Sequence, residues 1–88
     1  MKLFRTKVFK KDINKIKFKD KQYQSYIENI SLLLQKKKLP DYARNHQLIG
    51  NYSKYKEFHI SGDLLVIYII EDDTLKLIRI GTHSQLFK

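Results

Sequence analysis

The chain has 88 residues, which is enough for one domain and too short for two. It contains no cysteine, which excludes disulfides and thiolate metal sites and is typical of a reducing cytoplasm. Eighteen Lys and Arg residues against nine Asp and Glu residues give a formal net charge of +9. In so small a domain this excess favours a polyanionic partner, such as RNA or an acidic protein, over a purely solubilising role.

The N-terminal part predicts one strand and two helices. Residues 3–8 alternate between two faces, one of them charged, which is typical of a short strand. Apolar residues at helical spacing over 9–16 predict a short helix that ends near Asp20, and a longer apolar stripe over 23–34 predicts a second helix. We expect this second helix to end in three consecutive lysines, because Pro40 prevents its continuation.

The sequence also bears on location. It begins without the apolar core of a signal peptide. The longest apolar run, residues 64–70, is far shorter than the roughly 18 residues that a membrane-spanning helix needs. We therefore expect a cytoplasmic protein that does not engage a membrane.

The C-terminal half predicts a sheet. Residues 39–53 carry the only proline together with several Asn, Asp and Ser residues, and we interpret them as an ordered loop. Strands are expected at 55–60, 64–70 and 74–81, and the short turns between them predict an antiparallel meander. Residues 1–88 are thus predicted to form a single α+β domain, β-α-α-β-β-β, whose antiparallel sheet carries the two N-terminal helices on one face.

All three histidines lie in the C-terminal half. Alternation in the first strand of the meander places Phe58 and Ile60 in the core. His59 is therefore expected on the sheet face away from the helices. His46 lies in the predicted loop.

The last strand carries a candidate partner for these histidines. Arg79 shares parity with Leu77 and, if the extended conformation continues, with His83. If the strand ends meet in register, His59, Arg79 and His83 converge on one open surface with Asp63 at its rim.

Such a group suits the cleavage of RNA, which carries its own nucleophile in the 2′-hydroxyl. The reaction needs a base for that proton, an acid for the leaving 5′-oxygen and a cation for the charge that builds on the phosphate. Histidine suits both proton transfers, and arginine suits the third role. No metal or other cofactor is required.

Other interpretations stay open at this point. An isolated exposed histidine usually has no function, and the three histidines can also be counted as a zinc site, although their spacing matches none of the usual short metal motifs. The lysines of the first half, Lys7 among them, fit a solvated helix face and a phosphate-binding flank equally well. Lys54 is a further candidate for contact with substrate.

Three segments carry a resemblance to a known family. They are Asn45–Gly50 (NHQLIG), Glu57–Ile60 (EFHI) followed by Asp63, and Leu77–Phe87 (LIRIGTHSQLF). Together they resemble the YafQ-type toxins of the RelE/ParE superfamily, over nearly half the chain. The N-terminal half agrees in its β-α-α order, and the resemblance implies the RelE-like fold.

The resemblance also implies roles for individual residues. The positions that match the family's functional ones are His46, His59, Asp63, Arg79, His83 and Phe87. His83 is implied as the main proton-transfer residue, assisted by the other two histidines and the aspartate. Arg79 is implied to hold the scissile phosphate and Phe87 to stack on a base. Leu64 departs from the pattern, because the family often has a Trp there and leucine cannot stack.

Members of the family resemble bacterial type II toxins that enter the ribosomal A site and cut mRNA. A cognate antitoxin neutralises them, and here we expect its acidic segment to cover the basic cleft. DNA binding is expected only from the toxin–antitoxin complex. Two alternatives remain: a ParE-like inhibitor that binds DNA gyrase, for which proton-transfer residues are unnecessary, and a nucleic-acid-binding module without cleavage.

Overall fold

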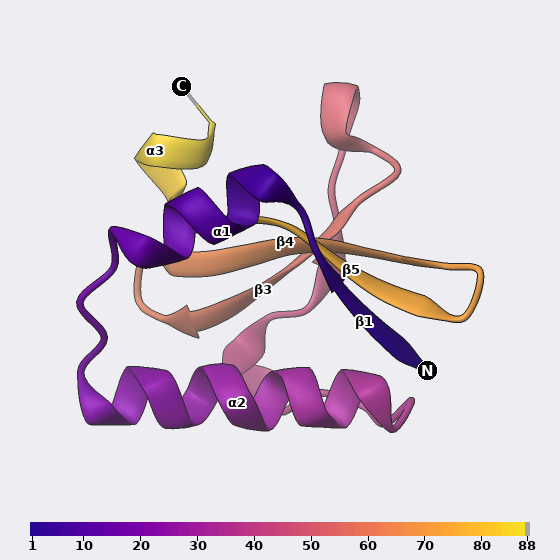
Figure 1. The fold of residues 1–88 in the computed structure, drawn as a ribbon, viewed down its shortest axis with the longest axis horizontal. Helices are drawn as coiled ribbons and strands as arrows, with labels where there is room; N and C mark the ends of the chain where they lie inside the picture. Colours follow the sequence, from indigo (N-terminus) through magenta and orange to yellow (C-terminus); the bar gives the residue numbers. More distant parts are fainter. Residues whose placement is uncertain (88) are drawn as a thin grey trace.

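A five-stranded sheet in the order β1-β5-β4-β3-β2 organises the chain (Figure 1). This computed structural model describes residues 1–87. Strands β3 (Lys56–Ser61), β4 (Leu64–Glu71) and β5 (Thr74–Thr82) pair antiparallel through short turns. The predicted α+β class and the antiparallel meander are therefore confirmed.

Strand β1 (Lys2–Arg5) departs from the predicted antiparallel pairing, because it lies parallel to β5 at the sheet edge. The helices and strands between β1 and β5 in the chain form the long connection that a parallel pair requires. β1 is also shorter than predicted. The Thr6 side chain accepts a hydrogen bond of 3.0 Å from the Phe9 amide and so begins helix α1 (Lys7–Asn14).

Helix α2 (Asp20–Leu34) ends before the lysines that were predicted to close it. Lys36 adopts a left-handed conformation with φ of 60°, and its amide donates to the Leu33 carbonyl. The chain therefore turns away at Lys36, two residues beyond the end of the helix. α2 is the longest described helix, and no helix within residues 1–87 has the length and apolar character to cross a membrane.

The two faces of the sheet are covered differently. α2 runs along one face, and α3 (His83–Leu86) lies on the other side (Figure 1). Both N-terminal helices contribute to the larger core: Phe9 comes from α1, and Ile30 and Leu33 come from α2. A much smaller core of Leu65, Ile67 and Leu86 lies beneath α3. Because α3 is only one turn long, much of this second face is left open for a site.

Candidate active site

One row of side chains crosses the sheet on the face that carries α3. The strand register pairs His46 with Glu57, Glu57 with Ile67, and Ile67 with Arg79. Directly paired residues point to the same face, and Ile67 belongs to the small core beneath α3. His59 lies in the next row, paired with Leu65 of the same core. The predicted orientation of His59, away from the two N-terminal helices, is thus confirmed.

Arg79 also lies on this face, which simple alternation along β5 does not predict. The β4–β5 register shifts after Ile67, so that Tyr68 pairs with Leu77 and one extra residue, Ile78, bulges in β5. The prediction that Arg79 shares a face with Leu77 is therefore wrong, since Leu77 packs in the larger core, on the opposite face.

His46 does not lie in a loop as predicted. It belongs to β2 (His46–Gln47), a two-residue strand that pairs with β3. The preceding Asn45 is fixed from the core, because the Tyr68 hydroxyl donates a hydrogen bond of 2.5 Å to its side-chain oxygen. A strand this short leaves no periodicity in the sequence.

The buried carboxylate of Glu57 joins two of the histidines. Glu57 is 4% exposed, and its Oε2 lies 2.9 Å from His59 Nε2 and 3.4 Å from His46 Nε2. The Nδ1 atoms face carbonyl oxygens, at 3.3 Å from Gly62 for His59 and 2.6 Å from Arg44 for His46. All four ring nitrogens thus face oxygen atoms that can accept a hydrogen bond. Sequence reasoning missed Glu57 as a site residue, although it shares parity with His59.

His83 is held through its backbone and keeps its ring free. β5 ends at Thr82, so the extended conformation does not continue to His83, which begins α3 instead. The His83 amide lies 3.2 Å from the Asp63 side-chain oxygen and 3.2 Å from its carbonyl oxygen. Asp63 and the capping box of Thr82 and Gln85 therefore fix where this helix starts. Among the described residues the His83 ring has no hydrogen-bond partner, and its centre lies 4.8 Å from that of Phe87.

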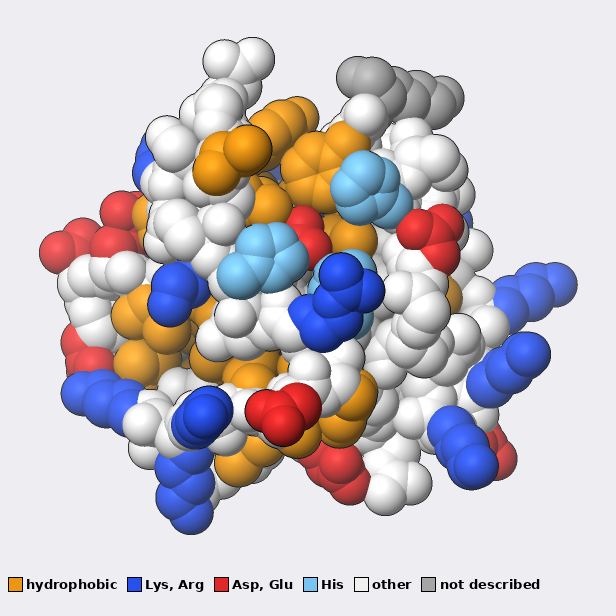
Figure 2. Space-filling view, turned by 180° about the vertical axis from the view of Figure 1, so that it is seen from behind, with side chains coloured by type: hydrophobic (Ala, Val, Ile, Leu, Met, Phe, Trp, Pro, Cys, Tyr) orange, Lys and Arg blue, Asp and Glu red, His pale blue; other side chains and the backbone are white. Residues whose placement is uncertain are grey.

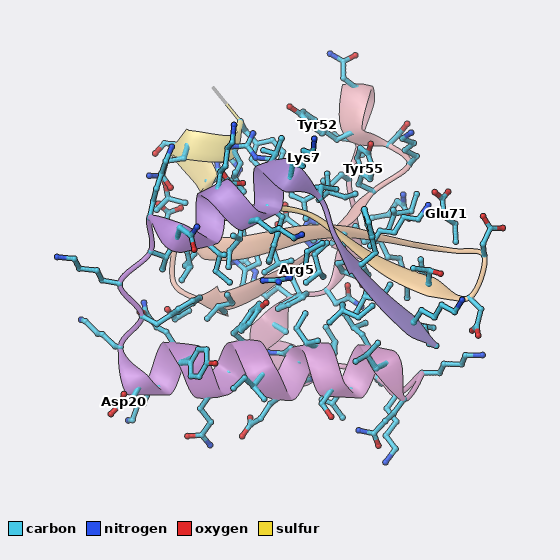
Figure 3. The ribbon with its side chains drawn as sticks, viewed as in Figure 1. Arg5, Lys7, Asp20, Tyr52, Tyr55 and Glu71 are labelled. Atoms are coloured by element: carbon cyan, nitrogen blue, oxygen red, sulfur yellow. The ribbon has the colours of Figure 1, made fainter. Side chains whose placement is uncertain are left out.

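These groups surround one open cavity of about 400 Å³. Its lining residues are Arg44, His46, Leu48, Ile49, Tyr52, Glu57, His59, His83 and Phe87. Figure 2 shows the histidines gathered around an acidic side chain, with hydrophobic side chains beside them. Tyr52 meets Phe87 edge to face at 5.3 Å between ring centres, and Figure 3 shows Tyr52 on the same side of the sheet as α3. The cavity therefore combines three imidazoles and a carboxylate with an aromatic wall.

The remaining predicted residues lie outside this lining. Arg79 turns toward α1, where its Nε and Nη2 lie 2.7 and 3.1 Å from the two carboxylate oxygens of Asp12. This hydrogen-bonded carboxylate raises the pKa of the Arg79 guanidinium above its ordinary value. Arg79 therefore shares the sheet face with the histidines but, contrary to the prediction, does not converge with them on the cavity.

Two predicted lysines and one departure from the family pattern can also be placed. Lys54 lies over the Tyr55 ring, with Nζ 5.2 Å from the ring centre, and Lys7 is exposed at the start of α1. Leu64 is buried in the larger core, on the opposite face of the sheet from the cavity. Among residues 1–87, no three or more His, Cys, Asp or Glu side chains form a group that could hold a metal ion.

Fold and site together define a small basic α+β domain with a histidine-lined cavity, and comparison with known proteins agrees. The full chain, residues 1–88, matches the family described as bacterial toxin of type II toxin–antitoxin system, YafQ. The putative toxin YafQ of Haemophilus influenzae is 42% identical over 64 residues, which span 68% of this chain and 63% of that protein. The mRNA interferase toxin YafQ of Escherichia coli K12 is 32% identical over 77 residues, which span 88% of this chain and 74% of that protein.

Solved structures of related toxins are similar to this chain over nearly its whole length. A copper-bound mutant toxin from Helicobacter pylori has a TM-score of 0.90 and 36% identity, covering 98% of both chains. YafQ in the E. coli DinJ-YafQ toxin–antitoxin complex has a TM-score of 0.83 and 26% identity, covering 98% of this chain and 96% of that chain. The chain therefore belongs to the YafQ family of bacterial toxins of type II toxin–antitoxin systems.

The Tyr68 hydroxyl that holds Asn45 gives the fold a sensitivity to high pH. Burial raises the pKa of the Tyr68 phenol from its ordinary 10.0 to about 12, against the smaller opposing effect of the hydrogen bond with Asn45. Because the folded-state pKa lies above the unfolded one, the stabilisation is complete below about pH 10 and is lost as pH rises toward 12. In urea unfolding between pH 10 and 12, the free energy of unfolding of wild type should fall with rising pH, and that of Tyr68→Phe should fall less. Identical pH dependence in the two proteins would contradict this role.

Proposed function

We propose that this protein is a toxin that cleaves mRNA on the ribosome, by attack of the RNA 2′-hydroxyl on the neighbouring phosphate. The observation that carries the proposal is the pairing of two kinds of histidine in one cavity. His83 has an unengaged ring, whereas His46 and His59 are tied to the buried Glu57 carboxylate. The E. coli relative is named an mRNA interferase, which supports the same reaction here.

The geometry suggests how the protons move. His83 is the group free to accept the 2′-hydroxyl proton, because no described partner occupies its ring. The 2′-oxygen then bonds to phosphorus as the bond to the 5′-oxygen breaks. His59 keeps its Nε2–H on Glu57 and gives up the Nδ1 proton, which lies in the longer contact of 3.3 Å with the Gly62 carbonyl, to the leaving 5′-oxygen. The products are a 2′,3′-cyclic phosphate and a 5′-hydroxyl.

The other site residues position the substrate in this proposal. His46 shares the Glu57 carboxylate and so supports the orientation of His59. Asp63 fixes the His83 backbone at the start of α3. Phe87 and Tyr52 offer ring faces and edges to a base. Cations that meet RNA phosphates are Arg44 at the cavity, Arg79 on the same sheet face, and Lys7 and Lys54 outside it.

The partner follows from charge and from the family. The net charge of +9 and the open cavity suit an antitoxin whose acidic segment covers the site. The complex of E. coli YafQ with DinJ supports a cognate antitoxin for this protein as well. We place the pair in the cytoplasm and assign any DNA binding to the toxin–antitoxin complex. A gyrase inhibitor acting by binding alone has no need for the paired histidines.

Substitution of His83 tests the site directly. His83→Ala should lower the rate of mRNA cleavage by about 100-fold or more, the usual contribution of a general acid or base. The measurement is mapping of new mRNA 5′-ends with translating ribosomes, and omission of ribosomes shows whether free RNA is cut. Ser84→Ala, the exposed neighbour on α3, is the matched control. Equal cleavage by the His83→Ala variant and wild type would remove His83 from the site.

Glu57→Gln tests the carboxylate. It keeps the side-chain shape and removes the charge that both imidazoles face, so His59 loses its ionic acceptor. The cleavage rate should fall at least about 10-fold, as expected when a carboxylate that orients a catalytic histidine is neutralised. Glu28→Gln on α2 makes the same chemical change on the other side of the sheet. If both variants cleave mRNA equally fast, the carboxylate has no part in the reaction.

A further inference from the structure

Helix α1 covers the part of the β5 edge that β1 leaves free. The pairing of β1 with β5 stops at Leu77. Beyond it, the Thr6 hydroxyl donates to the Ile78 carbonyl at 2.9 Å, and the Ile80 amide donates to an Asp12 carboxylate oxygen at 3.3 Å. Asp12 is thus fixed against β5 by the backbone as well as by Arg79.

Asp12 occupies only one edge of the Arg79 guanidinium. The carboxylate accepts from Nε at 2.7 Å and from Nη2 at 3.1 Å. A guanidinium has five N–H donors, so this bidentate contact leaves three of them available. The Arg79 side chain is 36% exposed, whereas the Asp12 side chain is 12% exposed. Asp12 therefore holds the arginine in one orientation and leaves part of its fork accessible.

A second hollow, of about 230 Å³, opens at this place between α1, β5 and α3. Lys15 and Gln85 line it together with Asp12 and Arg79. Lys15 is exposed and forms no ion pair with another described residue. The Gln85 side-chain oxygen accepts from the Thr82 amide, which leaves the Gln85 amino group as a donor. An ammonium, a guanidinium and an amide therefore border one small space, which suits a phosphate.

The hollow and the histidine cavity share α3 as their common wall. His83 and Phe87 face the cavity, whereas Gln85 and Leu86 line the hollow. Arg79 is two strands from Glu57 in the same cross-strand row, about 10 Å between Cα atoms at the usual strand spacing. One phosphate cannot occupy both places, but neighbouring phosphates of one RNA strand can.

We propose that this hollow is a second phosphate-binding site, which takes the RNA phosphate next to the scissile one. Lys15 and Arg79 contact that phosphate, and Asp12 is the positioning residue for Arg79. The inference rests on the proposed RNA cleavage. It refines the role that resemblance implies for Arg79, by moving its contact from the scissile phosphate to a neighbouring phosphate.

The test uses ribosomes programmed with short mRNAs in which one phosphate at a time is an uncharged methylphosphonate. In single-turnover cleavage, Lys15→Ala should raise the half-saturating protein concentration about threefold to tenfold and leave the maximal rate unchanged. On the mRNA whose neutral linkage lies next to the scissile one, Lys15→Ala and wild type should have the same half-saturating concentration. Lys21→Ala removes the same charge from α2 and serves as the control, with no such linkage dependence.

Asp12→Asn should also raise the half-saturating protein concentration on native mRNA. On the mRNA with the neutral linkage next to the scissile one, the variant and wild type should have the same half-saturating concentration. A merely structural role would weaken cleavage of every mRNA alike. If Lys15→Ala behaves as Lys21→Ala while wild type cleaves normally, the second site is wrong and the proposed function stands. If wild type cuts none of the mRNAs, the proposed function itself fails. Lys15 is exposed, so its variant tests the site even if Asp12→Asn does not fold.

Discussion

The buried carboxylate of Glu57 is the interaction on which the rest of the site depends. A carboxylate with 4% exposure is costly to bury unless cationic or hydrogen-bonding groups compensate it, and here two imidazoles from neighbouring strands do so. This compensation requires β2 to pair with β3 in one register, because a slip of one residue would turn His46 to the opposite face. The contact of Glu57 with the two histidines, the pairing of the two-residue strand β2 and the shape of the cavity therefore depend on one another.

The third histidine depends on a different constraint, which is the close approach of α3 to β5. A Cβ at Gly81 would lie 2.9 Å from the Gln85 side-chain oxygen and 3.3 Å from the Leu86 side chain. A larger residue there would displace the Gln85 oxygen, which accepts from the Thr82 amide at the start of α3. Since α3 also separates the cavity from the hollow at Arg79, its placement determines which groups would meet the scissile phosphate and which the neighbouring one in the proposed reaction.

The sequence predicted what regular alternation and helical spacing encode: the meander, the two N-terminal helices and the orientation of His59. Other features leave no such periodic signal. β2 has two residues, the bulge at Ile78 interrupts the parity that linked Arg79 to Leu77, and His83 begins a one-turn helix instead of ending a strand. Glu57 was missed because a single carboxylate on a strand gives no hint that two histidines from different strands will converge on it.

The central claim is that histidines in this cavity move the protons while the RNA 2′-hydroxyl attacks. The chemistry of the new RNA ends tests it most directly, by mass spectrometry of the fragments released from programmed ribosomes. Attack by the 2′-hydroxyl predicts a 2′,3′-cyclic phosphate on one fragment and a 5′-hydroxyl on the other, and no cleavage where the attacking nucleotide is 2′-deoxy. A 3′-hydroxyl with a 5′-phosphate, or unchanged cleavage at a deoxynucleotide, would show that water attacks instead and would contradict the account.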